Sequence, residues 1–409
     1  MPLDRLNEVL RTEIAGMQEK GTLKGEEAVV TGITRAAGEN GPRFHLEGHG
    51  EMAFIKMNSN AYLGMTLREE LIEAEEDAAR TFGVGPGAVR FISGTFGPHV
   101  ALENRLASFH GREAAMIFSS AYATVMGVLS SLVSPKTAVL SDSLNHNCII
   151  NAMRLARPVE KKVYPHLDME ALKAGLEELV GRVRRAIIVT DGIFSMRGDH
   201  APLDVIAGLA REYDARFPEN VVLMVDDSHG VGAIGATGRG TEEHTGATGV
   251  DVLVATLGKA LGVNGGYVTC DATTVSYLRE KAAFYIYSNP ITPSEAAASL
   301  KALEILDSAR GRELLSHLRA RTDRFRQGLV DLGYETVVGD HPVVPLMVRD
   351  TQETGRLVAH LATSGVLATG LSYPVVPRGD EEIRFQISAD HTDADIDAVL
   401  AVLADFSER

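Results

Sequence analysis

The chain contains no tryptophan and only two cysteines among 409 residues, Cys148 and Cys270. Two cysteines cannot build a framework of disulfides, so the composition fits a reducing compartment. No run of about 18 apolar residues occurs, and the first residues lack the apolar core of a signal peptide. The net charge of −15 argues against nucleic acid and anionic membranes as main partners. We therefore expect a cytoplasmic protein without a membrane or nucleic-acid partner.

The composition is otherwise that of a globular protein, with 45% hydrophobic and 23% charged residues. A chain of 409 residues is too long for one continuous core, so a large domain and a smaller one are expected. Apolar residues at helical spacing predict a helix over residues 3–20, either a lone surface helix or an arm lying on the body or on a partner subunit. Short alternating runs between residues 23 and 56 predict a small hairpin.

Strand-like apolar runs alternate with helical stretches between residues 65 and 270. The predicted strands are 115–118, 137–140, 186–190, 221–225, 252–256 and 266–269. The predicted helices between them include 100–109, 169–179 and 203–213. This alternation predicts an α/β fold with a mostly parallel sheet covered by helices on both faces.

The pattern changes after Pro293, where a long helical segment (293–332) leads into strands at 343–348, 365–370 and 382–387 and a closing helix at 393–407. We expect a smaller α+β domain there. The predicted organisation is an N-terminal helix with a hairpin segment (1–56), a large domain (57–292) and a small C-terminal domain (293–409).

Lys259 is the most informative single residue. It lies between glycines in the stretch 254–262, just after a predicted strand, and the preceding strand ends in Asp226-Asp-Ser-His229. Ligands of parallel sheets bind beyond the carboxyl ends of the strands, which is where these residues fall. A lysine that binds an aldehyde covalently, an aspartate facing a pyridinium nitrogen and a histidine at the phenolic oxygen are what pyridoxal 5′-phosphate (PLP) requires.

Two apparent nucleotide-binding motifs are not supported by the sequence around them. The glycines at 230, 232 and 235 match a dinucleotide fingerprint, but loop follows them where that motif needs a helix. Gly258-Lys259-Ala260 lacks the first glycine and the serine or threonine of a P-loop. No metal site is predicted.

Three further groups could surround Lys259. Ser119–Ala123 joins a strand to a helix, so its N–H groups could hold a phosphate at the helix N-terminus, although such serines are usually plain caps. Thr256 could add a phosphate contact. His146 follows another strand, where its ring could stack on a flat cofactor, although loop histidines are more often ordinary surface residues.

The motifs together resemble the α-oxoamine synthases, PLP-dependent enzymes of fold type I that condense an amino acid with an acyl-CoA. The resemblance runs from about Asn58 to His391. It rests on the stretches 60–64, 89–95, 142–146, 190–196, 226–229, 256–259, 287–289 and 383–384. The order of motifs is most similar to the glycine C-acetyltransferase branch (2-amino-3-ketobutyrate CoA ligases).

The resemblance implies a role for each matching residue. Lys259 would hold the cofactor covalently and act as base, with Asp226 at the ring nitrogen, His229 at the phenolic oxygen and His146 stacked on the ring. The other expected contacts are Ala121, Tyr122 and Thr256 at the phosphate, Ser195 near the ring, Asn60 and Arg384 at the substrate carboxylate, and Ser288 at the phosphate of the neighbouring subunit. A homodimer with shared active sites follows.

Some positions depart from the family pattern, namely Ala61, Thr124-Val125, Pro290 and the loop 262–266. They lie near the expected cofactor or acyl site, so they leave the amino acid and the acyl group open, whereas the expected PLP cofactor is unaffected. Glycine with acetyl-CoA is the first expectation. A longer acyl-CoA, or alanine or serine as the amino acid, is the alternative. An aminotransferase or lyase would keep the same PLP residues, whereas a regulatory module would be expected to lack Lys259 or Asp226.

Overall fold

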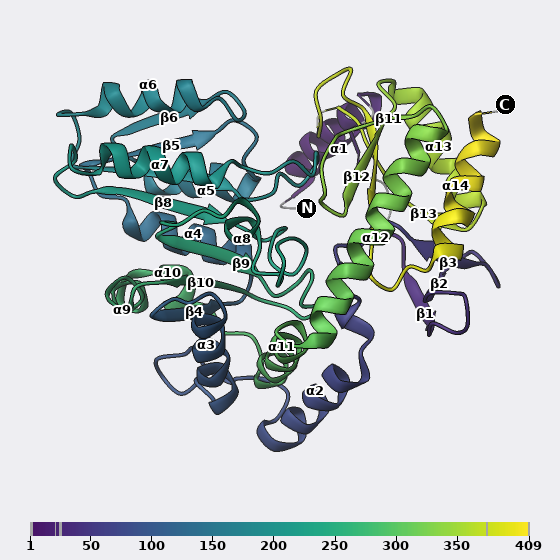
Figure 1. Cartoon of the computed structure of the whole chain (residues 1–409), viewed down its shortest axis with the longest axis horizontal. Helices are drawn as coiled ribbons and strands as arrows, with labels where there is room; N and C mark the ends of the chain where they lie inside the picture. Colours follow the sequence, from purple (N-terminus) through teal and green to yellow (C-terminus); the bar gives the residue numbers. More distant parts are fainter. Residues whose placement is uncertain (1–2, 21, 24–26, 374, 408–409) are drawn as a thin grey trace.

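A seven-stranded sheet forms the centre of the larger part of the molecule (Figure 1). The structure is a computed structural model that describes residues 3–20, 22–23, 27–373 and 375–407. The strands are β4 (Ala114–Phe118), β5 (Thr137–Asp142), β6 (Glu160–Tyr164), β7 (Arg185–Asp191), β8 (Val221–Asp226), β9 (Val252–Thr256) and β10 (Gly266–Cys270). Their order is β4-β10-β9-β8-β7-β5-β6. The pairs from β9 to β6 are parallel, and β10 runs antiparallel to both β4 and β9. The predicted mostly parallel sheet is confirmed.

Helices cover both faces of this sheet because its strands are apolar on both sides. On β7, Ile188 packs with α6 and α7, while its neighbours Ile187 and Val189 point to the opposite face and pack with α4 and α5. The helices of this part are α2 (Glu69–Phe82), α3 (Gly97–Phe109), α4 (Ala121–Leu132), α5 (Asn147–Ala156), α6 (Met169–Leu179), α7 (Leu203–Asp214), α8 (Thr241–Thr245), α9 (Ala272–Lys281) and α10 (Ala283–Ile286), with the 3-10 turn Met65–Leu67 before α2.

The C-terminal part contains a four-stranded sheet in the order β11-β12-β15-β14. The elements are β11 (Glu335–Thr336), β12 (Val343–Met347), β14 (Thr369–Leu371), β15 (Glu382–Gln386), α12 (Ala309–Asp331), α13 (Thr351–Thr363) and α14 (Asp393–Ser407). Phe325 of α12 packs edge-on against Phe385 of β15 in the core between helix and sheet. Every pair in this sheet is antiparallel.

The N-terminal strands join this C-terminal part. Beyond the expected hairpin there are three strands, β1 (Val30–Thr34), β2 (Arg43–Leu46) and β3 (Ala53–Lys56), and β3 pairs in parallel with β13 (Val366–Leu367). The predicted helix 293–332 is two helices, α11 (Pro293–Leu306) and α12, because the chain turns at Asp307 and Ser308 caps the second helix. α11 packs on α2 and α3. The division into three segments remains a prediction.

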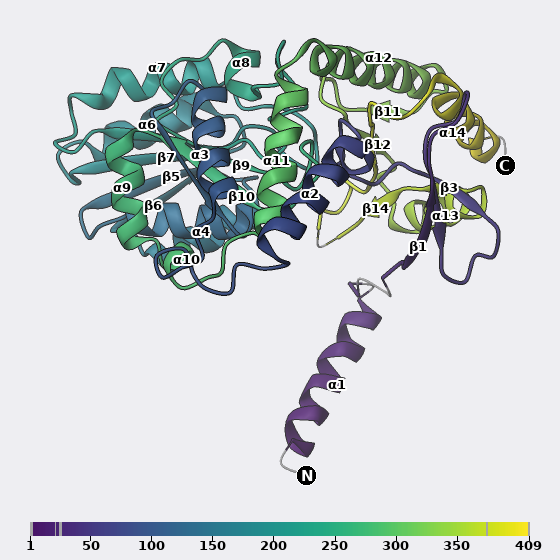
Figure 2. The same ribbon diagram turned by 90° about the horizontal axis from the view of Figure 1, so that it is seen from below.

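The first helix, α1 (Asp4–Glu19), projects away from the rest of the chain (Figure 2). It carries the predicted apolar positions, yet none of its residues is buried. Leu6, Val9 and Ile14 each leave about half of their surface exposed. Among the described residues, no helix has the length and apolar character needed to span a membrane.

Candidate active site

A cavity of about 270 Å³ opens beyond the carboxyl ends of β4, β7, β8 and β9. Each of these strands delivers polar residues to it, as the geometry of parallel sheets requires. The lining consists of Ser120, Ala121, Tyr122, His146, Cys148, Asp191, Ile193, Ser195, Asp226, Ser228, His229, Thr256 and Lys259. The structure thus brings together eight of the eleven residues predicted for the site.

Lys259 lies in the loop that follows β9 and is the only lysine or arginine among the described residues that line the cavity. Burial lowers the pKa of its ammonium group to about 8, although the carboxylates of Asp226 and Asp191 oppose the shift. A lysine with this pKa is in part a free amine near neutral pH. It can therefore attack an aldehyde and accept a proton.

The N-terminus of α4 forms the end of the cavity suited to an anion. Ser120 caps the helix by accepting a hydrogen bond from the N–H of Ala123 at 3.1 Å, which leaves the earlier N–H groups of Ala121 and Tyr122 facing the cavity. Gly266 of β10 lies so close that a Cβ there would be 2.2 Å from the Ala121 nitrogen. A side chain at this position would displace the backbone of Ser120 and Ala121.

Thr256 lies beside this loop, but its hydroxyl is already engaged. The hydroxyl donates to the carbonyl of Gly265 at 3.1 Å and accepts from the N–H of Gly258 at 3.0 Å. To donate to a phosphate it would have to release Gly265. Ser228 contrasts with it, because its Oγ is buried and has no protein partner.

Asp226 and Asp191 end neighbouring strands in register, so two carboxylates converge on the cavity floor. Burial and the charge of Asp226 raise the pKa of Asp191 well above its usual value. Asp191 accepts a hydrogen bond from the backbone N–H of His146 at 2.8 Å. Asp226 accepts one from the N–H of Ser228 at 3.1 Å and lies 3.5 Å from the thiol of Cys148. Burial, together with Asp226 and Asp191, raises the pKa of that thiol, which keeps it protonated.

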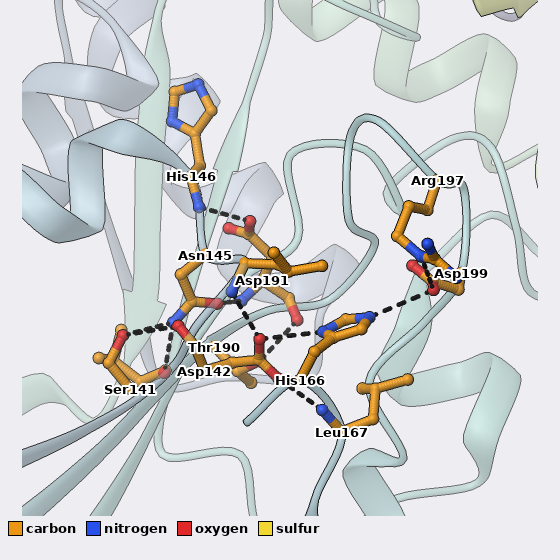
Figure 3. Close-up of polar contacts among 12 residues, drawn as sticks. Ser141, Asp142, Asn145, His146, His166, Leu167, Thr190, Asp191, Arg197 and Asp199 are labelled. Carbon is orange, nitrogen blue, oxygen red and sulfur yellow. Dashed lines mark hydrogen bonds and ion pairs between the residues drawn. The ribbon is translucent and has the colours of Figure 1, made fainter. Parts of the chain in front are cut away.

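His146 caps α5 through its ring, because Nδ1 accepts a hydrogen bond from the N–H of Cys148 at 3.2 Å. Its other nitrogen, Nε2, is left to carry the hydrogen. The side chain is exposed at the cavity opening, above the strand ends (Figure 3). It is accessible to a flat ligand.

His229 is buried on the opposite side and is held by two groups from distant parts of the chain. The Tyr62 hydroxyl lies 2.7 Å from its Nδ1, and His341 Nε2 bonds to its carbonyl at 2.8 Å. Burial, followed by the charges of Lys259 and Arg384, lowers the pKa of His229 well below its usual value. The ring is therefore neutral.

Asn60 and Arg384, the residues predicted for the substrate carboxylate, are brought together next to this histidine. Oδ1 of Asn60 accepts from Gln386 at 2.6 Å and from Arg384 at 3.4 Å. Nε of Arg384 is buried without a hydrogen-bond partner, and burial lowers the pKa of its guanidinium. A buried, incompletely paired guanidinium favours an anionic ligand.

Ser288 is not brought to the cavity of its own chain. It lies after α10, and its hydroxyl donates to the carbonyl of Asn289 at 3.4 Å. The prediction that it serves another subunit remains a prediction.

A larger cavity of about 830 Å³ lies at the other end of the sheet. It is lined by residues at the amino ends of strands, including Arg185, Val221 and Val252. None of the residues predicted for the site lines it. The smaller cavity is the candidate active site because the reactive groups converge there.

Several residues of the site were not predicted individually: Asp191, Cys148, Ser228, Tyr62 and His341. Asp191 could have been found, since it ends a predicted strand as Asp226 does. Tyr62 and His341 are 167 and 112 residues from His229 in the sequence, so no local pattern predicts their contacts with it.

Comparison with known proteins defines the class. Residues 53–403 match the family model described as aminotransferase class I and II. The chain is 38% identical over 397 residues to 8-amino-7-oxononanoate synthase 1 of Bacillus velezensis, covering 97% of this chain and 96% of that protein. It is also 38% identical over 397 residues to human mitochondrial 2-amino-3-ketobutyrate coenzyme A ligase, covering 97% and 90%.

Solved structures share the fold. Serine palmitoyltransferase of Sphingomonas wittichii superposes with a TM-score of 0.88 at 24% identity, covering 99% of this chain and 98% of that one. The chain belongs to the aminotransferase class I and II family and has the fold of the type I PLP-dependent transferases. Within that family its relatives are α-oxoamine synthases, so the predicted enzyme class is confirmed.

Proposed function

We propose that the enzyme condenses glycine with acetyl-CoA or another short acyl-CoA, releasing either CoA and a 2-amino-3-keto acid or CoA, CO₂ and an α-amino ketone. The general reaction type, a PLP-dependent condensation as in the α-oxoamine synthases, follows from family membership. Membership of this family also confirms PLP as the predicted cofactor. When bound, PLP supplies an electron sink for the carbanion formed at the α-carbon of an amino acid.

The residues present fit this cofactor. We assign covalent attachment to Lys259, the phosphate to the N–H groups of Ala121 and Tyr122, and the pyridine nitrogen to the carboxylate of Asp226. We assign His229 to the phenolic oxygen and His146 to the ring face, with Ser195 and Thr256 as further polar contacts. The buried, unpaired Oγ of Ser228 supports the presence of a polar ligand in this cavity.

The chain's own groups can perform the proton transfers. Lys259, with a pKa of about 8, can remove the α-proton of the amino acid near neutral pH. Arg384 and Asn60 would hold the substrate carboxylate and thereby orient the α-carbon. Nε2 of His146 carries a hydrogen at the cavity opening and can donate it to the acyl carbonyl as charge develops there.

One observation carries the choice of a short, uncharged acyl group. Among the described residues that line the cavity, Lys259 is the only lysine or arginine, and burial lowers the pKa of both histidines there, His146 and His229. Arg197 lies on the neighbouring loop, but its Nε is paired with Asp199 at 2.9 Å. The ω-carboxylate of a dicarboxylic acyl chain would therefore find no free cation there. The names of the two relatives nonetheless divide between the two branches, so a longer acyl-CoA with alanine or serine is the second candidate.

The test is a panel of acyl-CoAs against glycine, alanine and serine, followed by release of free thiol. We expect the highest kcat/KM with glycine and acetyl-CoA. Thiol release only with a longer acyl-CoA would overturn the acetyl assignment and keep the family reaction. Amino-group transfer to a keto acid without thiol release would indicate an aminotransferase on the same fold.

We also propose a homodimer with shared sites. Ser288 lies outside its own cavity, and several large apolar side chains are exposed on the described surface, on α1 and elsewhere. Phe91 is 67% exposed, Ile92 68% and Tyr287 80%. Such side chains on the surface of one chain are typical of an interface.

A further inference from the structure

A histidine outside the cavity connects two of the loops that form it. His166 lies in the turn after β6, and both of its ring nitrogens face carboxylates. Nδ1 is 3.0 Å from Oδ1 of Asp142, and Nε2 is 3.2 Å from Oδ2 of Asp199 (Figure 3). Its ring also packs edge-on against Phe194, at 4.4 Å between centroids. Because a carboxylate can only accept, both ring nitrogens must donate, which requires the imidazolium form.

The first carboxylate belongs to the loop that carries His146. Asp142 ends β5, and its two oxygens also accept from the N–H groups of Leu144 at 2.8 Å and Leu167 at 2.9 Å. Its side chain is 1% exposed. Asp142 therefore defines the course of the backbone between β5 and His146.

Asn145 extends the connection to β7. Its side chain accepts from the N–H of Asp191 at 2.8 Å and donates to the carbonyl of Val189 at 2.8 Å. Asp191 in turn accepts from the N–H of His146 at 2.8 Å. Ser141 links Asn145 to Asp142, because its hydroxyl accepts from Asn145 at 2.9 Å and donates to the carbonyl of Asp142 at 3.1 Å, so that the contacts in Figure 3 run from His146 to Asp199.

The second carboxylate belongs to the loop that carries Ser195. This loop, residues 192–200, folds back on itself through the bridge between Ile193 and His200. The N–H of Phe194 donates to the carbonyl of Asp199 at 3.0 Å, and Arg197 donates to its carboxylate. Asp199 is thus the point at which this loop is attached to the β5–α5 side of the cavity.

The turn that presents His166 is itself strained. Leu167 has φ of +56°, a conformation that a leucine adopts only when its surroundings impose it. Its N–H, held by Asp142, supplies part of that constraint. The strained backbone of Leu167 therefore lies next to a histidine that is paired at both ring nitrogens.

We propose that His166 is a positioning residue that, as a cation clamped between Asp142 and Asp199, sets the distance between the His146 loop and the Ser195 loop across the cavity. This role for His166 rests on the proposed function, in which His146 and Ser195 contact the cofactor. The clamp itself does not depend on the acyl substrate. It predicts an effect on cofactor binding whichever amino acid and acyl-CoA the enzyme uses.

The charge of the clamp has a defined pH range. Burial works against protonation, but the hydrogen bonds that the ring donates to Asp142 and Asp199 outweigh it and raise the pKa of His166 to about 9. The charged groups around it are these two carboxylates and Arg197 on Asp199, while Tyr164 and Asp191 act on Asp142. The clamp is therefore complete at neutral pH and is lost as the pH rises through about 9.

The test compares PLP binding to cofactor-free wild type and to His166→Gln. The glutamine keeps a neutral donor but cannot bridge two carboxylates as a cation. We expect the Kd of PLP to rise about tenfold at pH 7, with a weaker visible circular-dichroism band per bound cofactor. At about pH 10 the wild-type clamp is neutral too, so the ratio of the two Kd values should fall to about twofold or less. His360→Gln is the matched control, a half-buried histidine bonded to a backbone carbonyl in the C-terminal part of the chain, and should change neither quantity.

A second variant tests the clamp even if His166→Gln fails to fold. Asp199→Asn removes one carboxylate and should lower the pH at which His166 titrates in the histidine NMR spectrum of the cofactor-free protein. Equal Kd ratios at pH 7 and pH 10, or an unchanged titration in Asp199→Asn, would overturn the clamp. A failure of the acyl-CoA panel with normal PLP binding would count against the proposed reaction and leave the clamp standing.

Discussion

The phenolic oxygen of Tyr62 lies 2.7 Å from Nδ1 of His229, although 167 residues separate the two. The same hydroxyl is 3.3 Å from Oδ1 of Asn60, which already accepts from Gln386 at 2.6 Å. A hydroxyl has one hydrogen, and we assign it to the shorter contact with His229. Nε2 of His229 then carries the ring hydrogen and faces the cavity as a donor.

Tyr62→Phe should therefore impair the reaction through His229. Loss of one buried hydrogen bond of this kind corresponds to about 1 kcal/mol, or roughly a fivefold to tenfold lower kcat, because His229 can adopt the wrong tautomer. Steady-state kinetics with the best substrate pair measures it. Tyr334→Phe, which removes a hydroxyl bonded to the carbonyl of Leu403 in the C-terminal part of the chain, is the control. An unchanged kcat in Tyr62→Phe would show that something else orients His229.

Lys259→Ala should abolish covalent attachment of the cofactor and turnover. Wild-type protein purified with PLP should be yellow and keep its colour on dialysis, whereas the variant should lose it. The control is Lys281→Ala, which removes an exposed lysine at the end of α9. Normal turnover by Lys259→Ala would refute the assignment of this lysine.

Lys259 should also destabilise the cofactor-free protein at neutral pH. Its pKa is about 8 in the folded chain and 10.5 without burial. Between these values the unfolded chain binds a proton that the folded chain lacks, so this residue's contribution to stability rises with pH and is least favourable below about 8. Lys259→Met should raise the free energy of unfolding by about 2 kcal/mol at pH 7, and the gain should shrink toward pH 10. Denaturant titration at the two pH values tests this, and a gain that does not depend on pH would contradict it.

Asp226→Asn should slow the reaction by weakening the anion assigned to the pyridine nitrogen. Removal of one preorganised electrostatic group predicts a barrier higher by about 2–4 kcal/mol. The neighbouring Asp227→Asn is the comparison. That carboxylate accepts two hydrogen bonds from Thr241, from the backbone at 2.7 Å and from the hydroxyl at 2.5 Å, and does not line the cavity. Its loss should lower the melting temperature more than kcat, and an Asp226→Asn rate within about threefold of wild type would disprove the electronic role.

Shared active sites can be tested by mixing two inactive variants. In a mixed dimer of Lys259→Ala and Ser288→Glu, one site receives an intact Lys259 from one chain and an intact Ser288 from the other. Random exchange should therefore restore about a quarter of wild-type activity. If each Ser288 served its own chain, both sites would stay inactive. Sedimentation that shows an active monomer would refute the dimer.

The sequence predicts the sheet and the strand-end residues well, for a physical reason. Buried parallel strands are continuous apolar runs, and β9 and α6 begin and end where the pattern places them. The edge strand β6 was missed because Glu160–Tyr164 is half exposed and carries lysines.

The features that the sequence does not predict depend on contacts between distant segments of the chain. The pairing of β3 with β13 joins segments about 300 residues apart, and neither strand alone indicates its partner. The same holds for the site. Lys259, Asp226 and His229 follow from local motifs, whereas the hydrogen bonds of Tyr62, His341 and His166 depend on how separate loops meet. The convergence of these three residues on one cavity was therefore predictable, and the residues that hold them in place were not.

The position of β10 has a consequence for synthesis of the chain. Within the seven-stranded sheet β4 has one neighbour, β10, and that strand is made roughly 150 residues later. At roughly 5–20 residues per second, the apolar strand Ala114–Phe118 waits on the order of ten seconds with both edges open while the ribosome completes the rest of the sheet. The loop that begins at Ser119 can take its final shape only after that. Nascent chains stalled before Gly266 should therefore engage chaperones through β4, and those stalled well beyond Cys270 should not.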